Sequence, residues 1–499
     1  MSNVYDLFVQ GASHGGTFIQ NADGEVRYTY EEFDALTAQY ANFLLEQGVR
    51  AGDRVMVQVE KSAECLLVYF ACLRSGCIYL PLNTAYKKDE LAYFIENAEP
   101  SLILCDPKDS DQFRQLSNAP VFTMNSSGVL NYDVAHQGTE YSTRNCDDND
   151  VAVIIYTSGT TGRPKGAMIT HSNIGTNAHT LSDCWGWQTQ DVMLHALPIY
   201  HVHGLFVATH LPVMNGSAIT YLDRFDPQQI ISLLPSSTVY MGVPTNYTRL
   251  LAQPELSEQS CAKMRLFTSG SAPLLTHTFE DFKIRTGHTI VERYGMSETG
   301  MNTSNPLDGE RKAGTVGIPL TGIDCRIVDS QGHTVEPDTT GSLQLKGPNV
   351  FKGYWRMPEK TAEEFSDDHY FQTGDLAQKD DDGYISIVGR SKDLIISGGL
   401  NIYPKEIETL LDNMDGVVES AVIGLPDPDF GEAVSAVIVA DESTDLNASK
   451  VTAYIKEKVA SFKATKHVFF VNELPRNAMG KVQKNILRDT FTARIEDSF

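Results

Sequence analysis

The sequence predicts an α/β protein with a large N-terminal domain, built of helix-sandwiched sheets and a β-rich subdomain, and a small mobile α+β C-terminal domain. Three observations support this prediction. From Tyr28 onward, apolar residues at helical spacing alternate with short β-branched runs. Over about 314–389, short strands separated by turn residues replace that alternation. After this stretch the chain resumes with an α+β pattern of its own.

The elements of the large domain follow from these patterns. Residues 31–47 carry apolar side chains on one helical face, and runs of β-forming residues separate such helical stretches. Nearly continuous apolar runs are typical of strands that helices cover on both faces. The expected strands are 54–59, 101–105, 151–155, 218–222 and 239–241.

The C-terminal part begins at a short charged segment, 391–393. Turn residues such as 329–332 and 380–383 divide the β-rich subdomain. This segment, Ser391-Lys-Asp393, follows Gly389-Arg390 directly, and no low-complexity linker separates the two domains. We therefore expect any domain motion to be a hinge at this segment. The prediction is therefore a large domain 1–390 and a small domain 391–499, the latter with a helix near 404–413 and strands at 417–423 and 433–439.

Size and charge limit the function classes. A chain of 499 residues makes roughly three to four domain-sized units. Its 41% hydrophobic and 21% charged residues are ordinary for a globular protein. With 40 Lys and Arg against 64 Asp and Glu, the net charge of −24 disfavours nucleic acids and anionic lipid surfaces as partners. An anionic substrate would need a few well-placed cations and backbone N–H groups.

Cysteine content and the chain ends point to the cytoplasm. None of the eight cysteines forms a C-x-x-C pair, and Cys65 borders the apolar run 66–73, which indicates buried, reduced thiols. The first residues do not resemble a signal peptide, and no run approaches the ~18 apolar residues of a membrane span. The last three residues, 497–499, are not a peroxisomal tripeptide. We expect no membrane insertion.

The strongest local motif is Tyr156-Thr-Ser-Gly-Thr-Thr-Gly-Arg-Pro-Lys-Gly166, directly after an apolar strand. Glycines let backbone N–H groups approach an anion, hydroxyls add hydrogen bonds, and Arg163 and Lys165 add charge. The pattern differs from the P-loop of NTPases, since no Gly-Lys-Ser/Thr follows. The motif predicts a phosphate-binding loop; the alternative is a flexible surface loop.

With this loop, the chain resembles the adenylate-forming superfamily of acyl-CoA synthetases, peptide-synthetase adenylation domains and luciferases. The resemblance covers nearly the whole chain and rests on motifs in the family's order. These are the loop 156–166, Leu197-Pro-Ile-Tyr-His201, Arg293-Tyr-Gly-Met-Ser-Glu-Thr299, Thr373-Gly-Asp375, Gly389-Arg390-Ser-Lys-Asp393 and Pro475-Arg-Asn-Ala-Met-Gly-Lys481.

The resemblance implies a nucleotide site. Lys165 and the hydroxyls of the loop would hold the β,γ-phosphates of ATP, and Glu298 would bind Mg²⁺, a hard cation suited to bridging phosphates. Ser297 replaces the threonine that usually precedes this glutamate. Asp375 and Arg390 would take the ribose hydroxyls. The remaining nucleotide residues that the resemblance implies are Thr157, Ser158, Gly159, Thr160, Thr161, Gly270, Ser271, Ala272 and Tyr294.

The resemblance also implies two half-reactions. Lys481 corresponds to the family's catalytic lysine, which contacts the carboxylate and the phosphate during adenylation. The small domain then rotates about Lys392, and Gly398 and Gly399 would border a tunnel for the pantetheine arm of CoA. Asn477 stands where many relatives have threonine.

The prediction of which acid is the substrate depends on Arg293. Relatives that use apolar acids commonly have a small residue at this position, and a guanidinium facing an acyl pocket is costly unless an anion pairs with it. A second carboxylate on the substrate, as in malonate or methylmalonate, would be that anion. The alternative is that Arg293 pairs with Glu292 or Asp308 and faces solvent. The supporting substrate residues are His201, His203, Ser271 and Met301.

Within the superfamily the chain looks most like the malonyl-CoA synthetases, through segments such as 81–86, 241–245, 301–306 and 346–355. The favoured function is therefore ATP-dependent ligation of a dicarboxylic acid to CoA, with ATP, CoA and Mg²⁺ as cosubstrates and cofactor. One alternative is adenylation of another short, medium-chain or aryl acid, or of an acid for a carrier protein. The other is a catalytically dead adenylate-binding protein, which the presence of Lys165, Glu298, Asp375 and Lys481 disfavours.

Overall fold

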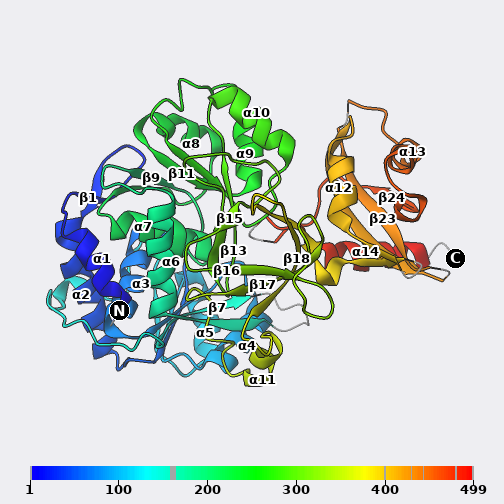
Figure 1. Ribbon diagram of the computed structural model, residues 1–499. Helices are drawn as coiled ribbons and strands as arrows, with labels where there is room; N and C mark the ends of the chain where they lie inside the picture. Colours follow the sequence, from blue (N-terminus) through cyan, green and yellow to red (C-terminus); the bar gives the residue numbers. More distant parts are fainter. Residues whose placement is uncertain are drawn as a thin grey trace.

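The computed structural model describes residues 3–157, 164–397, 400–428, 430–441, 443–477 and 480–496. Four sheets organise the chain, three in the large domain and one in the small domain. Figure 1 shows the small domain, with α12, α13 and α14, as a separate lobe beside the large one. The α/β fold class predicted from the sequence is confirmed.

The first sheet has six strands and contains the phosphate-loop motif. Its strands are parallel except β8, which runs antiparallel to β7. In order across the sheet they are β6 (Val121–Thr123), β5 (Leu102–Cys105), β3 (Arg54–Gln58), β4 (Ile78–Pro81), β7 (Val151–Thr157) and β8 (Lys165–Thr170).

Helix α3 (Ala63–Ser75) lies in the interior, since all 13 of its residues are buried. A helix that is apolar on every side has to be covered on every side. The side chain of Ser62 caps its N-terminus by accepting from the Cys65 N–H, and Gly76 ends it with φ of 70°. The other helices of this region are α1 (Val4–Ala12), α2 (Tyr30–Glu46), α4 (Lys88–Ala98) and α5 (Ser110–Leu116), with the short turns η1 (Pro107–Asp109) and η2 (Val134–His136).

The second sheet has nine strands and positions most of the site. Strands β9 to β13 and β1 are parallel where they pair, with β14 and β2 antiparallel at its two sides. Its order is β15 (Ile318–Pro319), β14 (Gly300–Ser304), β13 (Val291–Met296), β12 (Leu266–Ser269), β11 (Val239–Gly242), β9 (Val192–His195), β10 (Ala218–Tyr221), β1 (Thr17–Gln20) and β2 (Val26–Thr29).

Helices cover this sheet, with α8, α9 and α10 grouped together at the top of the large lobe in Figure 1. A π-helical segment, η3, precedes α7 directly. Such segments are rare and often occur at functional sites. The helices are α6 (His171–Cys184), η3 (His203–Val207), α7 (Ala208–Met214), α8 (Pro227–Leu233), η4 (Leu234–Ser236), α9 (Pro244–Leu251) and α10 (Thr276–Thr286).

The third sheet is the expected β-rich subdomain. Its four antiparallel strands are β16 (Asp324–Val328), β17 (Gly341–Lys346), β18 (Phe371–Lys379) and β19 (Ile385–Arg390), accompanied by α11 (Pro358–Glu363). Immediately after β19 comes the one-turn helix η5 (Ser391–Asp393), which leads into the last sheet.

The small domain packs its helices on the fourth sheet. The strand order is β21 (Leu400–Ile402), β20 (Ile395–Ser397), β23 (Gly431–Ala440) and β22 (Val417–Asp427), with β24 (His467–Phe470) also paired to β23. The helices are α12 (Pro404–Asp412), η6 (Ser461–Lys463), α13 (Ala448–Lys458) and α14 (Lys484–Glu496). The expected helix at 404–413 and strands at 417–423 and 433–439 correspond to α12, β22 and β23.

All eight cysteines are free thiols, and seven of them are buried. This matches the expectation of buried, reduced cysteines, and burial raises the pKa of Cys65 to about 12. Among the described residues, no helix is both long and apolar enough to cross a membrane.

Candidate active site

Three of the motif segments lie at the carboxyl ends of parallel strands in the second sheet. His201 and His203 follow β9, Gly270 and Ser271 follow β12, and Arg293 and Tyr294 lie in β13. Ligand sites of α/β sheets form at this edge because the loops that follow neighbouring strands converge there.

Arg293 is buried, with 2% of its surface exposed. Its Nε and Nη2 atoms have no hydrogen-bond partner among the described residues, and burial lowers its pKa to about 9. The guanidinium lies against Gly270, where an added Cβ would come within 2.4 Å of Nη1. A buried cation without an anionic partner is costly, so an anion beside Arg293 would lower the free energy of this arrangement.

The two acids considered as partners of Arg293 are not paired with it. Glu292 is the preceding strand residue, so its side chain points to the other face of β13. One of its carboxyl oxygens accepts from the Leu274 N–H, and burial raises its pKa to about 8. No ion pair joins Arg293 to Asp308 within the described ranges, and Arg293 does not face solvent. This geometry favours the ligand interpretation of Arg293.

Two histidines lie beside Arg293. Burial, with the charges of Lys481 and Arg293, lowers the pKa of His201 to about 3. Its Nδ1 accepts from the His203 N–H at 3.3 Å, which leaves the proton on Nε2 of a neutral ring. His203 is fully buried, its Nδ1 lies 3.5 Å from Ser271 Oγ, and its Nε2 has no partner in the described structure. Unpaired ring atoms in this pocket are available for a polar ligand.

Ser271 is held in the left-handed backbone region, with φ of 72°. This conformation costs free energy for a residue with a Cβ and clusters at ligand sites. It follows β12 directly after Gly270, so the turn that carries both residues is tightly constrained.

Lys481 reaches this pocket from the small domain. Asn477 holds the turn, because its side-chain oxygen accepts from the Lys481 N–H at 3.0 Å and its own N–H donates to the Lys481 carbonyl. Burial, followed by the charge of Arg390, lowers the pKa of Lys481, and Arg293 acts in the same direction. The charges of Lys481 and Arg293 therefore act on the same imidazole, in the direction that keeps the ring neutral.

The strands that flank the phosphate-loop motif, β7 and β8, pair antiparallel. Register pairs Thr157 at the end of β7 with Lys165 at the start of β8, so Lys165 is a strand residue rather than part of the loop. The predicted Ser158, Gly159, Thr160 and Thr161 lie outside the described residues. Lys165 is buried, forms an ion pair with Glu364 at 3.0 Å, and lies 4.2 Å from the ring centroid of Tyr354.

Glu298 lies beside Thr157. Its Oε1 accepts from the Tyr354 hydroxyl at 3.1 Å and from Thr157 Oγ1 at 3.4 Å. Burial raises its pKa, and no lysine or arginine forms an ion pair with it in the described part of the chain. A buried carboxylate without a cation partner among the described residues, beside Thr157, fits a hard cation such as Mg²⁺, which would be held by Glu298.

The two ribose candidates are joined to each other. Neighbouring strands place Asp375 opposite Arg390, with Arg390 Nε 2.8 Å from Asp375 Oδ1. The Tyr294 hydroxyl donates to Asp375 Oδ2 at 2.5 Å. The charge of Asp375 raises the pKa of Arg390. Asp375 is thus fixed from two sides. Ala272 and Ser297, which belong to two other motifs, are partly exposed.

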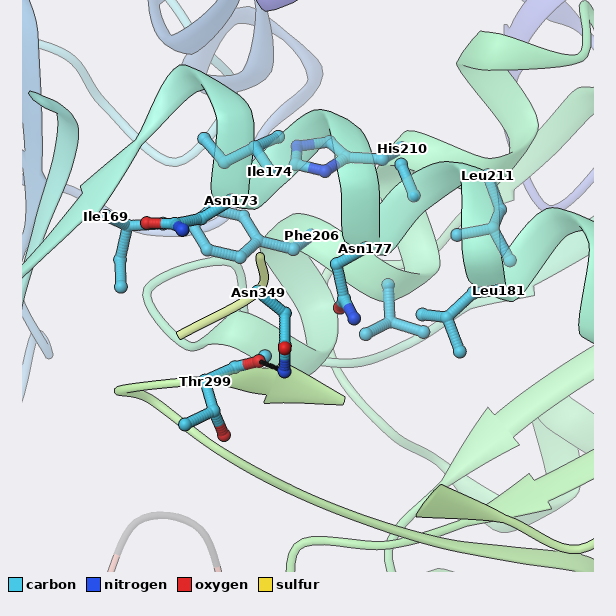
Figure 2. A pocket seen from close by; sticks show the side chains of 13 residues that line it. Ile169, Asn173, Ile174, Asn177, Leu181, Phe206, His210, Leu211, Thr299 and Asn349 are labelled. Carbon is cyan, nitrogen blue, oxygen red and sulfur yellow. Dashed lines mark hydrogen bonds between the residues drawn. The ribbon is translucent and has the colours of Figure 1, made fainter. Parts of the chain in front are cut away.

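Met301 is buried in β14 directly opposite Gly295, where an added Cβ would come within 2.4 Å of the Met301 methyl carbon. The side chain of Asn177 in α6 fixes the Met301 backbone on both sides: its Oδ1 accepts from the Met301 N–H, and its Nδ2 donates to the Met301 carbonyl. Figure 2 shows Asn177 and Asn349 in the small, mainly apolar pocket behind this segment, with Asn349 donating to the Thr299 carbonyl. Thr299 and Gly300, which directly precede Met301, line this pocket. Neither Arg293 nor Lys481 lines it.

Lys392 lies in the helical turn η5 between the third and fourth sheets. Burial lowers its pKa, and no acid forms an ion pair with it in the described ranges. Gly398 and Gly399, predicted at the CoA tunnel, lie outside the described residues.

Sequence reasoning did not identify three residues that contact or adjoin the predicted site residues. Tyr354 lies in a segment quoted for its similarity, but nothing there indicated that it would contact both Lys165 and Glu298. Glu364, at the end of α11, is one of several acids on an exposed helix and carries no motif. Glu292 was considered only as a partner of Arg293.

Replacing Glu298 with glutamine should abolish most adenylation without unfolding the protein. The amide oxygen of glutamine can still accept from Tyr354 and Thr157, but the charge that would hold Mg²⁺ is gone. Because burial already disfavours the charged form, the melting temperature should not fall. The measurement is acid-dependent ATP–pyrophosphate exchange at subsaturating Mg²⁺; an unchanged rate would exclude Glu298 from the metal site.

The chain matches the family "AMP-binding enzyme" over residues 9–355 and "AMP-binding enzyme C-terminal domain" over 406–481. The malonate–CoA ligase of Arabidopsis thaliana is 35% identical, over 91% of this chain and 79% of its own. A feruloyl-CoA synthase of Amycolatopsis is 33% identical over 96% of this chain and 95% of its own.

Among solved structures, ATP-bound MatB from Rhodopseudomonas palustris superposes with a TM-score of 0.96 at 47% identity, covering 99% of both chains. Apo MatB from the same organism, with the same identity and coverage, gives 0.83. The agreement in family, fold and ordered motifs shows that the chain belongs to the AMP-binding enzymes of the adenylate-forming superfamily and, within it, to the AMP-forming acid–CoA ligases.

Proposed function

We propose that this enzyme is a malonate–CoA ligase, which converts malonate, ATP and CoA into malonyl-CoA, AMP and pyrophosphate through malonyl-adenylate. The observation that carries the proposal is the buried guanidinium of Arg293, which lacks an acid partner among the described residues. Its charge and that of Lys481 both act on His201. Two cations that act on one histidine suit an acid with two carboxylates.

Relatives support the class of reaction more strongly than the acid. Malonate–CoA ligases and a feruloyl-CoA synthase match this chain at nearly the same identity. Feruloyl groups carry no second carboxylate to pair with a buried arginine. The malonate proposal therefore depends on Arg293 rather than on the identities.

In the first half-reaction, an oxygen of one malonate carboxylate attacks the α-phosphorus of ATP, and the bond to pyrophosphate breaks. We assign Arg293 to the distal carboxylate, with the neutral His201 Nε2–H and His203 as hydrogen-bond partners. Lys481 would lie between the reacting carboxylate and the phosphate, where it reduces the repulsion of two anions. Thr157, Lys165 and the hydroxyls at 158, 160 and 161 would bind the β,γ-phosphates.

Glu298 would hold Mg²⁺, which supplies positive charge to the phosphate oxygens. Asp375 would accept from the ribose hydroxyls, with Tyr294 and Arg390 keeping its carboxylate in place. Gly270, Ser271, Ala272 and Tyr294 would line the adenine pocket, with Ser297 close to the phosphates.

In the second half-reaction, the CoA thiol attacks the malonyl carbonyl and AMP leaves. We place the division between the domains at residues 390 and 391, with rotation about Lys392 bringing 398–399 to the CoA tunnel. ATP-bound and apo MatB, at the same identity and coverage, match the present structure with TM-scores of 0.96 and 0.83, so that protein takes more than one conformation. A cytoplasmic location stays a prediction from the cysteine content.

A panel of acids tests the proposal. In ATP–pyrophosphate exchange, malonate should be used far better than acetate, propionate, butyrate or octanoate, since only a second carboxylate pairs with Arg293. Methylmalonate belongs in the panel to measure the room around the central carbon. Equal use of octanoate and malonate would contradict the dicarboxylate assignment and leave the ligase class intact; product formation with carrier protein but not CoA would identify a different acceptor.

A further inference from the structure

A buried lysine outside the sequence motifs contacts the end of the strand that precedes His201 and His203. Lys61 stands between β3 and α3, and 8% of its surface is exposed. Its Nζ lies 2.9 Å from the His195 carbonyl, 2.6 Å from the Leu222 carbonyl and 3.1 Å from His195 Nδ1. It also lies 4.1 Å from the ring centroid of Tyr221. Three acceptors and an aromatic face satisfy the ammonium group, so the lysine joins the ends of β9 and β10.

His195 transmits this contact to the loop. The residue is fully buried, and its Nε2 lies 3.0 Å from the Gly204 carbonyl. A carbonyl can only accept, so Nε2 carries the proton and Nδ1 is free to accept from Lys61. Burial and the charge of Lys61 hold the pKa of His195 well below its ordinary value, which keeps the ring neutral and this tautomer in place.

Gly204 is the point at which the loop closes. Its carbonyl accepts from His195 and from Thr209 Oγ1, the latter at 2.9 Å. An added Cβ at Gly204 would come within 2.1 Å of the Pro198 carbonyl oxygen, so the start and end of the loop 196–204 are in direct contact. His201 and His203 lie between these two points, and the Leu205 N–H donates to the His201 carbonyl.

We propose that Lys61 and His195 are positioning residues for the acid pocket. Neither touches the substrate; Lys61 fixes His195, and His195 fixes Gly204 and with it the rings of His201 and His203 over Arg293. This inference rests on the proposed function only in taking these histidines as contacts of the acid. It assigns a role to two buried titratable residues that lie outside the motifs of the nucleotide site.

Three substitutions test it in the full-length enzyme. Lys61→Met keeps the length of the side chain and removes its donors. His195→Asn keeps an acceptor near the Nδ1 position but loses the bond to Gly204, whereas His195→Gln can still donate from near the Nε2 position. Lys61→Met and His195→Asn should raise KM for malonate by about tenfold or more, since small displacements of contact groups have effects of this size. His195→Gln should remain within about threefold of the unmodified enzyme.

The readout separates positioning from stability. KM for ATP should stay within about twofold in every variant that folds, because the nucleotide residues lie on other loops. Tyr221→Phe is the control: it removes a hydroxyl that donates to the Ser62 carbonyl at 3.2 Å and keeps the ring beneath Lys61, so KM for malonate should not change. If Lys61→Met fails to fold, the comparison of His195→Asn with His195→Gln still tests the positioning role.

Unchanged KM for malonate in His195→Asn, or equal increases for malonate and ATP, would overturn the inference. If the unmodified enzyme prefers another acid, the same measurements are made with that acid. The proposed function then fails in the acid panel, whereas the positioning role fails only in these variants.

Discussion

Replacing Arg293 with alanine should lower kcat/KM for malonate by about 100- to 1000-fold. Breaking a buried ion pair by removing one partner costs ~3–5 kcal/mol, and about 1.4 kcal/mol corresponds to a factor of ten. Because the guanidinium Nε and Nη2 have no other partner among the described residues, the bound carboxylate would lose its only close cation apart from Lys481. Steady-state kinetics with malonate varied at saturating ATP measures the loss.

Binding of ATP should change little, since we assign Arg293 to the acid and not to the phosphates. Arg249→Ala, which removes an exposed arginine of the nearby helix α9, is the matched control and should behave like the unmodified enzyme. Arg293→Lys should recover part of the activity, because it restores the charge without the planar two-donor geometry. An Arg293→Ala enzyme with unchanged malonate kinetics would show that the guanidinium does not bind the acid.

Much of the fold was predictable because each element has a local signature. The amphipathic pattern expected over 31–47 forms α2 (Tyr30–Glu46), and the β-branched run at 54–59 forms β3 (Arg54–Gln58). The one-residue differences arise at element ends, where assignments commonly shift by a residue. At the start of α2 the N-terminus is fixed by a capping box of Thr29 and Glu32.

The site was predictable only where a motif names its residues. Arg293 stands out in sequence because a charge occupies a position expected to be small, and the structure shows that charge buried and unpaired among the described residues. Contacts made across sequence distance have no such signature. Glu364 pairs with Lys165 from 199 positions away, and Lys61 contacts His195 from 134 positions away. Only the packing of separate elements brings these residues together.

The two half-reactions should respond oppositely to two lysine substitutions. Lys481→Ala should lower the rate of acyl-adenylate formation by about two to three powers of ten, the range seen when a preorganised group that stabilises developing charge is removed. In the proposed mechanism Lys481 acts during adenylation, and its charge, together with that of Arg293, lowers the pKa of His201, so we expect the loss in this half-reaction. Given preformed malonyl-adenylate and CoA, the variant should make malonyl-CoA at nearly the unmodified rate.

Lys392→Pro should show the reverse bias, with adenylation retained and thioester formation lost. Lys392 lies in the one-turn 3₁₀ helix η5, whose backbone φ is close to the value that proline fixes, so the substitution suits the present arrangement and restricts rotation away from it.

Lys450→Ala, which removes an exposed lysine paired with Asp445 in the small domain, is the control and should affect neither half-reaction. Rapid-quench measurement of each half-reaction, with far-UV circular dichroism to verify folding, distinguishes the outcomes. If Lys481→Ala slows both halves equally, or Lys392→Pro slows neither, the small domain does not alternate between two working orientations, and one arrangement must serve both steps.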